Sequence, residues 1–365
     1  MEKITSNSEE VRKILLGALD LNVNVLIPGP PGCGKSSVIE QVAHEWKDGV
    51  PIHMFHLVTS DPIDAKGMPT EVDDVLTGNK MWDFRPFGEL MRIIDSRDPI
   101  IQGHCDGPCI AFLDDFGTAQ KSVQAAWMQI ILARRLGQVR IHPEVRFVMA
   151  TNRTGDKSGA DQGVLETIKG RSLVLPMDAN VQTWARWAIS NPLPNGNPHP
   201  AEVVAFARWV DSKSEPLFEF KPTKDAELNS CTPRNLSRMA EFVDLWGDKC
   251  PLVAINGCVG PHIGTKFLAF LKTFKQLPKL EAVVKDPTGT KVPSDLNLQY
   301  PMITYLSGKA TNKNFEEITQ YVLRFPPEFR VMFTKDVVAN WPQCVNHTAY
   351  GSLIADVADD VYEAA

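Results

Sequence analysis

The sequence predicts an α/β fold in which a parallel sheet flanked by helices is followed by a mainly helical region. Short strand-forming runs alternate with helical patterns over the first half of the chain, which is typical of βαβ units. A glycine-rich loop stands between the first such run and a helix, and from about Val181 the pattern is helical only. We therefore expect an α/β domain over residues 1–180, a helical domain over 181–250, and a mainly helical region over 251–365.

The elements of this fold are predicted from residue periodicity. Ser6 and Glu9 stand at capping-box spacing before apolar residues at helical spacing, which indicates a first helix. A helix over 35–44 follows the glycine-rich loop, and Pro233 is expected to start another. Strands are expected at residues 24–27, 52–58, 109–114, 146–151 and 172–177. Further helices are expected at residues 201–210, 233–246, 265–274, 315–323, 329–338 and 353–361.

Composition excludes several classes of protein. The chain has 38 basic and 44 acidic residues, which argues against broad coating of nucleic acid. The charge balance is still compatible with a local basic channel. No apolar run approaches the ~20 residues that span a bilayer, so no membrane insertion is expected. The seven cysteines are scattered, and the N-terminus lacks the pattern of a secretory signal. We expect a cytoplasmic protein with reduced thiols.

The glycine-rich loop matches the pattern G-x-x-x-x-G-K-S/T between a strand and a helix. Its residues are Gly29, Pro30, Pro31, Gly32, Cys33, Gly34, Lys35 and Ser36. Glycines allow backbone N–H groups to surround phosphates at a helix N-terminus, Lys35 would reach the β- and γ-phosphates, and Ser36 would bind Mg²⁺. We assign ATP binding to these eight residues and Ser37.

Two later strand ends carry polar side chains. The apolar run 110–113 ends in Asp114 and Asp115, in the manner of a Walker B motif. Asp114 would bind Mg²⁺, and Asp115 would orient or deprotonate the attacking water. The run 147–151 ends in Asn152.

The order of these motifs resembles that of AAA+ ATPases over roughly residues 5–250. The resemblance implies that Asn152 is sensor 1, that Arg171 is an arginine finger supplied to a neighbouring subunit, and that Arg234 is sensor 2 of a helical lid over 181–250. The finger region reads Lys-Gly-Arg-Ser instead of the commoner Asp-Arg-Phe, so Lys169 or Arg171 fills that role. Members usually carry Glu at the position of Asp115, and the shorter side chain predicts slow turnover.

Within that family, residues 59–67 and 123–126 are similar to segments of the MoxR type. This resemblance implies a homo-oligomeric, hexameric ring that uses ATP and Mg²⁺ to remodel or mature a partner protein, with a von Willebrand factor A protein as a possible partner. It also implies that segments 68–84 and 136–142 face the ring pore. Met81, Trp82 and Phe84 would then either grip a substrate or pack on their own ring.

Two other functions remain open. The chain is alternatively a McrB-like or helicase-like motor on nucleic acid, or a monomeric P-loop kinase or regulatory switch. Arg134, Arg135 and Arg140 form a basic cluster that fits contact with nucleic acid or an acidic substrate. A structural alternative places the first two in the last turn of a helix before Gly137, where cations complement the helix dipole.

Overall fold

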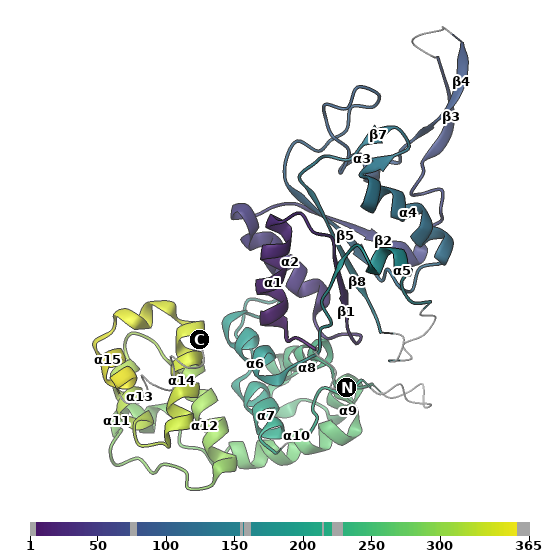
Figure 1. The fold of residues 1–365 in the computed structure, drawn as a ribbon. Coiled ribbons are helices and arrows are strands. Elements are labelled where there is room, and N and C mark those ends of the chain that lie inside the picture. The colour runs from purple at the N-terminus through teal and green to yellow at the C-terminus, as the bar shows by residue number, and fades with distance from the viewer. Residues whose placement is uncertain are drawn as a thin grey trace. The chain divides into compact units, whose positions relative to one another are not determined.

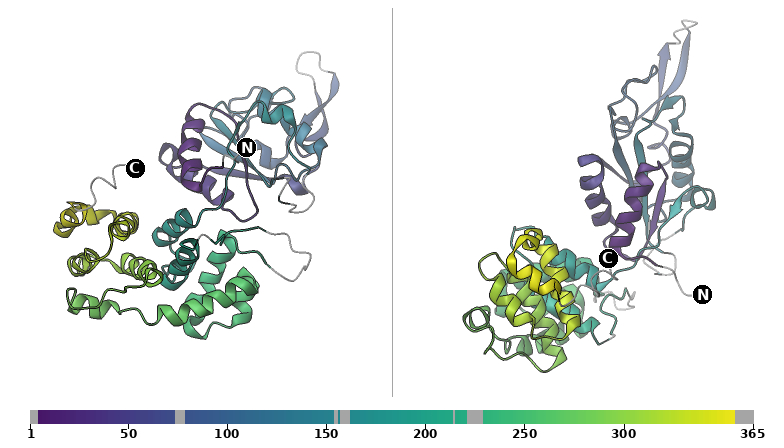
Figure 2. Two further views of the ribbon diagram at one scale, coloured as in Figure 1. Left: turned by 60° about the horizontal axis from the view of Figure 1, so that its bottom comes forward. Right: turned by 60° about the vertical axis from the view of Figure 1, so that its left-hand side comes forward.

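The computed structural model describes residues 5–73, 79–153, 156, 162–213, 215–220 and 229–355. The chain divides into two compact units, Met1–Ala179 and Asn180–Ala365. Figures 1 and 2 show the course of the chain through both. Each unit is described by itself below.

A five-stranded parallel sheet forms the centre of the Met1–Ala179 unit, in the order β2-β5-β8-β1-β9. The strands are β1 (Val25–Pro28), β2 (Ile52–His56), β5 (Cys109–Asp114), β8 (Val145–Thr151) and β9 (Leu173–Val174). Pro28 lies opposite Thr151, and His56 lies opposite Asp114. The carboxyl ends of the central strands therefore meet at one edge of the sheet, and the predicted fold class is confirmed.

Helices cover both faces of this sheet, which explains the continuous apolar runs of its strands. Alternate residues of each strand point to opposite faces. Ile110 and Phe112 pack in one core with α1 (Ser8–Asp20) and α2 (Lys35–Glu45), whereas Ala111 and Leu113 pack in another with α4 (Lys121–Ala133). Figure 1 shows α1 and α2 on one side of the strands and α4 on the other.

Two hairpins extend from the sheet domain. The longer one pairs β3 (Met68–Asp73) with β4 (Lys80–Arg85), and both views in Figure 2 show it projecting away from the sheet. The shorter one pairs β6 (Arg135–Leu136) with β7 (Val139–Arg140). Short helices follow β4 and precede β9, namely α3 (Gly88–Met91) and α5 (Glu166–Lys169). The hairpins occupy the segments 68–84 and 136–142 that the sequence singled out.

Two local predictions in this unit were wrong. The capping box of α1 is formed by Asn7 and Glu10, one residue later than the predicted pair, because the Asn7 side chain accepts the N–H groups of Glu9 and Glu10. Ser6 instead forms a bridge to Met177. Arg134 and Arg135 do not lie in the last turn of a helix, since α4 ends at Ala133 and Arg134 adopts the left-handed conformation with a φ of 56°.

The Asn180–Ala365 unit is helical in its described residues. Its helices include α6 (Val181–Ser190), α7 (Ala201–Asp211), α8 (Pro233–Trp246), α9 (Leu252–Val259), α10 (Pro261–Phe274), α11 (Leu280–Lys285), α12 (Leu296–Lys309), α13 (Phe315–Val322), α14 (Pro327–Asn340) and α15 (Thr348–Ala355). Helix α8 has the predicted bounds, with Pro233 in its first turn. The predicted helix over 353–361 extends beyond the described residues. Among the described residues, no helix has the length and apolarity that a membrane crossing requires.

Two apolar cores stabilise this helical unit. One gathers side chains of α6 to α10, and the other gathers side chains of α11 to α15. An ion pair joins the two groups of helices, because the guanidinium of Arg208 on α7 donates to the carboxylate of Asp336 on α14. Each of these side chains is only 1% exposed, and Arg208 also donates to the hydroxyl of Thr304 at 3.0 Å.

Candidate active site

The glycine-rich loop turns from β1 into α2 at the carboxyl edge of the sheet. Gly32 and Gly34 have φ values of 72° and 103°, in the left-handed region that favours glycine. A Cβ atom on Gly29 would lie 2.6 Å from the carbonyl oxygen of Met177, so that position also requires glycine. Within the described part of the chain, the N–H groups of Gly32 and Gly34 donate no hydrogen bond. They are free donors before the N-terminus of a helix, which suits a phosphate.

Lys35 is the best-connected side chain of the site. Its ammonium group donates to the carbonyl oxygens of Gly29 at 2.9 Å and Pro30 at 3.1 Å, and to Asn152 Oδ1 at 3.1 Å. Lys35 is 8% exposed. The structure thus brings the lysine of the loop together with the amide at the end of β8, 117 residues later in the chain. In the first turn of α2, Ser36 is partly buried and Ser37 is exposed.

The two carboxylates lie at the end of β5, next to β8. The carboxylate of Asp114 accepts the N–H group of Asp115 at 3.0 Å. Burial raises the pKa of Asp114, and the charge of Asp115 raises it further, while that N–H group and the charge of Lys35 oppose the rise. A bound cation would relieve this cost, because it favours the ionised carboxylate. The oxygen donors of Asp114 and Ser36 are of the type that suits Mg²⁺, which takes one or two carboxylates and completes its shell with water and phosphate oxygens.

Asp115 leaves the strand through a tight turn. Its φ is 51°, a left-handed conformation that aspartate tolerates better than most residues. The following residues are tied to β8, because Phe116 N–H donates to Ala150 O at 2.9 Å and Gly117 N–H donates to Thr151 Oγ1 at 3.1 Å. These contacts fix the backbone of the turn that follows the two carboxylates.

Arg153 lies next to the candidate site and was not singled out by the sequence. It follows Asn152, and its guanidinium forms ion pairs with Asp178 at 2.8 Å and Asp156 at 3.1 Å. Asp178 N–H donates to Ser6 O, so these contacts fix the end of β8 against the segment after β9. No local motif marks this role, because Asp178 lies 25 residues from Arg153.

Gln124 links α4 to the segment that carries the predicted arginine finger. It is fully buried, and its side chain donates to Ala119 O and Gly163 O and accepts the N–H group of Leu165 at 3.1 Å. Helix α5 begins directly after Leu165. Gln124 therefore fixes the base of the segment that leads to Arg171.

The two candidates for the arginine finger have different surroundings. Lys169 forms an ion pair with Glu166 at 2.7 Å. Arg171 is exposed between α5 and β9, and its side chain donates to the carbonyl oxygen of Thr167 at 3.2 Å. A backbone carbonyl competes less for a guanidinium than a carboxylate does. Arg171 is therefore the more available of the two.

The remaining predicted residues have simpler settings. Arg234 is exposed in the first turn of α8, whose N-terminus is capped by Thr232. It belongs to the Asn180–Ala365 unit, and its role as sensor 2 stays a prediction. Cys33 is buried in the loop, and that burial raises the pKa of its thiol despite the nearby Lys35. A reactive thiolate at this helix N-terminus is therefore not expected.

In the sheet unit, a parallel sheet flanked by helices carries the glycine-rich loop and polar groups at its carboxyl edge. Residues 24–165 match the family model of the AAA domain, dynein-related subfamily. The matched segment contains the glycine-rich loop, Asp114, Asp115 and Asn152. No curated protein matches the chain.

The solved structures that match this chain have low sequence identity and low TM-scores. NtrX from Brucella abortus has a TM-score of 0.38 and 14% identity, covering 96% of this chain and 68% of that one. The P216G mutant of RuvB from Thermotoga maritima has a TM-score of 0.40 and 16% identity, covering 87% and 88%. A putative ATPase from Cytophaga hutchinsonii has a TM-score of 0.33 and 11% identity, covering 72% and 81%.

Proposed function

We propose that this chain hydrolyses ATP with Mg²⁺ and uses the reaction to remodel or mature a partner protein. The observation that carries the proposal is the contact between Lys35 and Asn152 at the edge of the sheet, beside free N–H groups of the glycine-rich loop. A phosphate-binding loop, a lysine and a polar amide are parts that a triphosphate site needs. The match of residues 24–165 to the AAA domain supports the same function.

Each residue has a defined task in this proposal. Lys35 would exchange its carbonyl contacts for phosphate oxygens, to which its charge is better matched. Ser36 and Asp114 would hold Mg²⁺, which neutralises charge on the phosphates when bound. Asp115 would accept a proton from the attacking water, and Asn152 would orient that water and the γ-phosphate.

Arg171 would act in a neighbouring subunit of a homo-oligomer, as a hexameric ring provides. Its exposure and its weak intramolecular contact favour it over Lys169, which pairs with Glu166. An arginine supplied in trans stabilises the charge that develops during phosphoryl transfer. ATP turnover would then require assembly of the oligomer, whereas a monomeric kinase or switch would be active without assembly.

The hairpin β3–β4 is the part proposed to contact the partner. Its exposed side chains include Met68, Met81, Trp82 and Phe84, with Trp82 71% exposed. Opposite residues share a face, so Trp82 and Phe84 stand with Pro69 on one side and Met81 stands with Thr70 on the other. An isolated two-stranded hairpin with exposed aromatic groups suits an apolar protein segment, whether a substrate or a von Willebrand factor A partner.

A steady-state assay of phosphate release tests this function. The proposal predicts Mg²⁺-dependent release whose specific activity rises with protein concentration, and its loss in Lys35→Ala. The exposed Lys13 of α1 provides a matched control, so Lys13→Ala should behave as wild type. Activity that is independent of concentration would exclude the action in trans, and activity no higher than that of Lys35→Ala would exclude ATP hydrolysis.

A further inference from the structure

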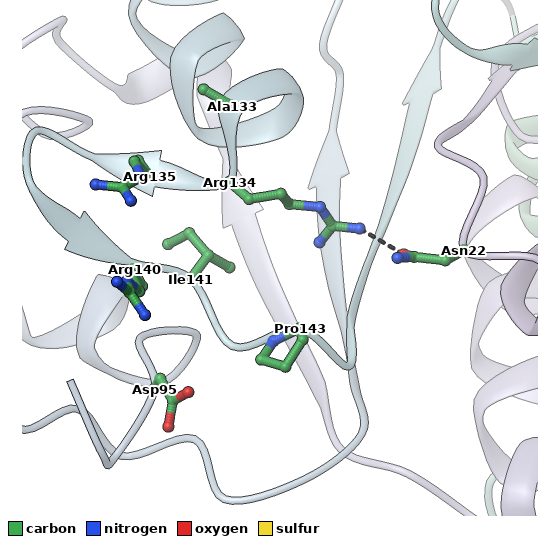
Figure 3. A pocket seen from close by; sticks show the side chains of 8 residues that line it. All are labelled: Asn22, Asp95, Ala133, Arg134, Arg135, Arg140, Ile141 and Pro143. Atoms are coloured by element: carbon green, nitrogen blue, oxygen red, sulfur yellow. Dashed lines mark hydrogen bonds between the residues drawn. The ribbon is translucent and has the colours of Figure 1, made fainter.

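Arg135 and Arg140 lie directly opposite each other in the hairpin β6–β7. Opposite residues of an antiparallel pair point to the same face, and like charges at such positions destabilise the pair. Both side chains are exposed, and neither makes an ion pair or a side-chain hydrogen bond with the described residues. Figure 3 shows both guanidinium groups on the same side of a cavity of about 420 Å³. The hairpin thus holds two cations together, and no carboxylate among the described residues forms an ion pair with either.

Three acidic side chains near this hairpin form hydrogen bonds or ion pairs with groups other than the two guanidiniums. Asp95 lines the cavity, but its carboxylate pairs with Arg97 at 3.1 Å. Asp98 accepts the backbone N–H groups of Arg140, Ile100 and Ile101. Glu144 pairs with Lys47 at 2.8 Å. The charge of Asp98 offsets part of the charge of Arg140. The donor groups of both guanidiniums are left for a group from outside.

Arg134 adds positive charge next to Arg135 and Arg140, but its guanidinium is held by other groups. Its guanidinium donates to Val145 O at 2.7 Å and to Asn22 Oδ1 at 2.5 Å, and Figure 3 shows it directed away from Arg135 and Arg140. Burial lowers its pKa to about 10, so it remains a cation at neutral pH. It contributes to the local potential as a fixed charge.

We propose that Arg135 and Arg140 form a binding site for a phosphate group at this cavity. Each guanidinium presents a planar fork of donors. A single fork satisfies the two oxygens of a carboxylate, whereas two adjacent forks match the larger number of oxygens and the higher charge of a phosphate. The phosphate belongs either to the backbone of a single nucleic-acid strand or to a free phosphate compound. The site does not depend on ATP hydrolysis, so it goes beyond the proposed function.

Binding of two probes to the full-length chain tests this site. The first probe is a fluorescein-labelled single-stranded oligothymidylate, followed by fluorescence anisotropy at several salt concentrations. The second is sodium pyrophosphate, followed by calorimetry in EDTA without Mg²⁺. Wild type is compared with Arg135→Ala/Arg140→Ala and with Arg135→Lys/Arg140→Lys. The control is Lys13→Ala/Lys272→Ala, which removes two exposed cations elsewhere.

We expect the double alanine variant to lose at least about tenfold in affinity for one probe, because two charged hydrogen-bonding groups are removed. The double lysine variant should be intermediate, since it keeps charge and loses the forks. If the oligothymidylate is the ligand, the magnitude of the slope of log K against log salt should be smaller by about 1.4 in the double alanine variant. Binding of the oligothymidylate identifies single-stranded nucleic acid as the source of the phosphate group. Binding of pyrophosphate alone identifies a free phosphate compound as the source.

Three results with folded variants would overturn the proposal. They are failure of both probes to bind wild type, unchanged affinity in the double alanine variant, and an equal loss in the control variant. Circular dichroism reports whether each variant is folded. If the double alanine variant is not folded, the double lysine variant decides, and wild-type affinity for both probes in that variant would refute recognition by guanidinium forks.

Discussion

The two units each bury a cation, and the two cations have different surroundings. In the helical unit, Arg208 meets Asp336 in a fully buried ion pair. In the sheet unit, Lys35 is nearly as buried, and its ammonium group donates to neutral oxygens of Gly29, Pro30 and Asn152. The buried ion pair serves structure, because loss of one partner would leave an uncompensated buried charge. The neutral oxygens around Lys35 can instead be exchanged for the charged oxygens of a phosphate. This difference separates the stabilising core of the protein from its candidate active site.

The largest expected effect concerns ATP turnover, to which the sheet unit is assigned. Arg171→Ala should lower ATP turnover by about 10³-fold or more while ATP binding is retained, because a finger acts only on the transition state. Steady-state phosphate release and equilibrium binding of ATP provide the two readouts. Lys169→Ala is the matched variant and should retain turnover, since Lys169 is paired with Glu166.

Mixing variants tests the same residue in assembled protein. Arg171→Ala and Asp115→Asn are each expected to be inactive, and their mixture should recover part of the activity if sites are shared between subunits. An Arg171→Ala variant with normal turnover would remove the arginine from the mechanism.

Removal of the buried ion pair between Arg208 and Asp336 tests its contribution to the stability of the helical unit. Asp336→Asn should lower the free energy of unfolding of the helical unit by about 3–5 kcal/mol, because it leaves the Arg208 cation buried without its partner. Replacement of both partners, as in Arg208→Met/Asp336→Leu, should cost less than the single change. Chemical denaturation followed by circular dichroism measures both. A double variant that is less stable than Asp336→Asn would contradict this account.

Asp115→Glu should raise turnover, by up to about 100-fold, because the longer side chain brings its carboxylate closer to the water it activates. Phosphate release measures the change, with Asp115→Asn as the inactive control. The left-handed backbone at this position disfavours most residues, so a small loss of stability is also expected. A decrease in turnover would show that the site is built around the shorter carboxylate.

The smallest expected effect concerns Asp114, whose pKa is raised by burial and by Asp115. A carboxyl group with a raised pKa in the folded state binds protons more tightly there than in the unfolded chain, so its contribution to stability falls as pH rises through that pKa. Asp114→Asn should therefore raise the melting temperature of the nucleotide-free protein at neutral pH. The gain should shrink as pH is lowered towards the ordinary pKa of aspartate.

Thermal melts of both proteins over this pH range, without nucleotide or Mg²⁺, check the prediction. The same substitution is expected to abolish Mg²⁺-dependent turnover. A variant that is less stable than wild type at neutral pH would contradict the electrostatic cost assigned to Asp114.

The sequence predicted those features that depend on local patterns. The glycine-rich loop, the apolar strands and the N-terminus of α8 follow from short motifs, and a parallel sheet places the ends of β5 and β8 side by side. Pairings between distant residues had no such signal. Arg208 and Asp336 are 128 residues apart, and nothing near either residue indicates its partner. The cap of α1 was misplaced by one residue, since Ser6 and Asn7 are both common capping residues.

The central claim is that the loop around Lys35 holds a triphosphate, and equilibrium binding of ATP tests it most directly. The account predicts that the full-length protein binds ATP in the presence of Mg²⁺, that Lys35→Ala binds at least about tenfold more weakly, and that Lys13→Ala binds as wild type. Absence of detectable ATP binding to the folded wild-type protein, or equal affinity in Lys35→Ala, would contradict it.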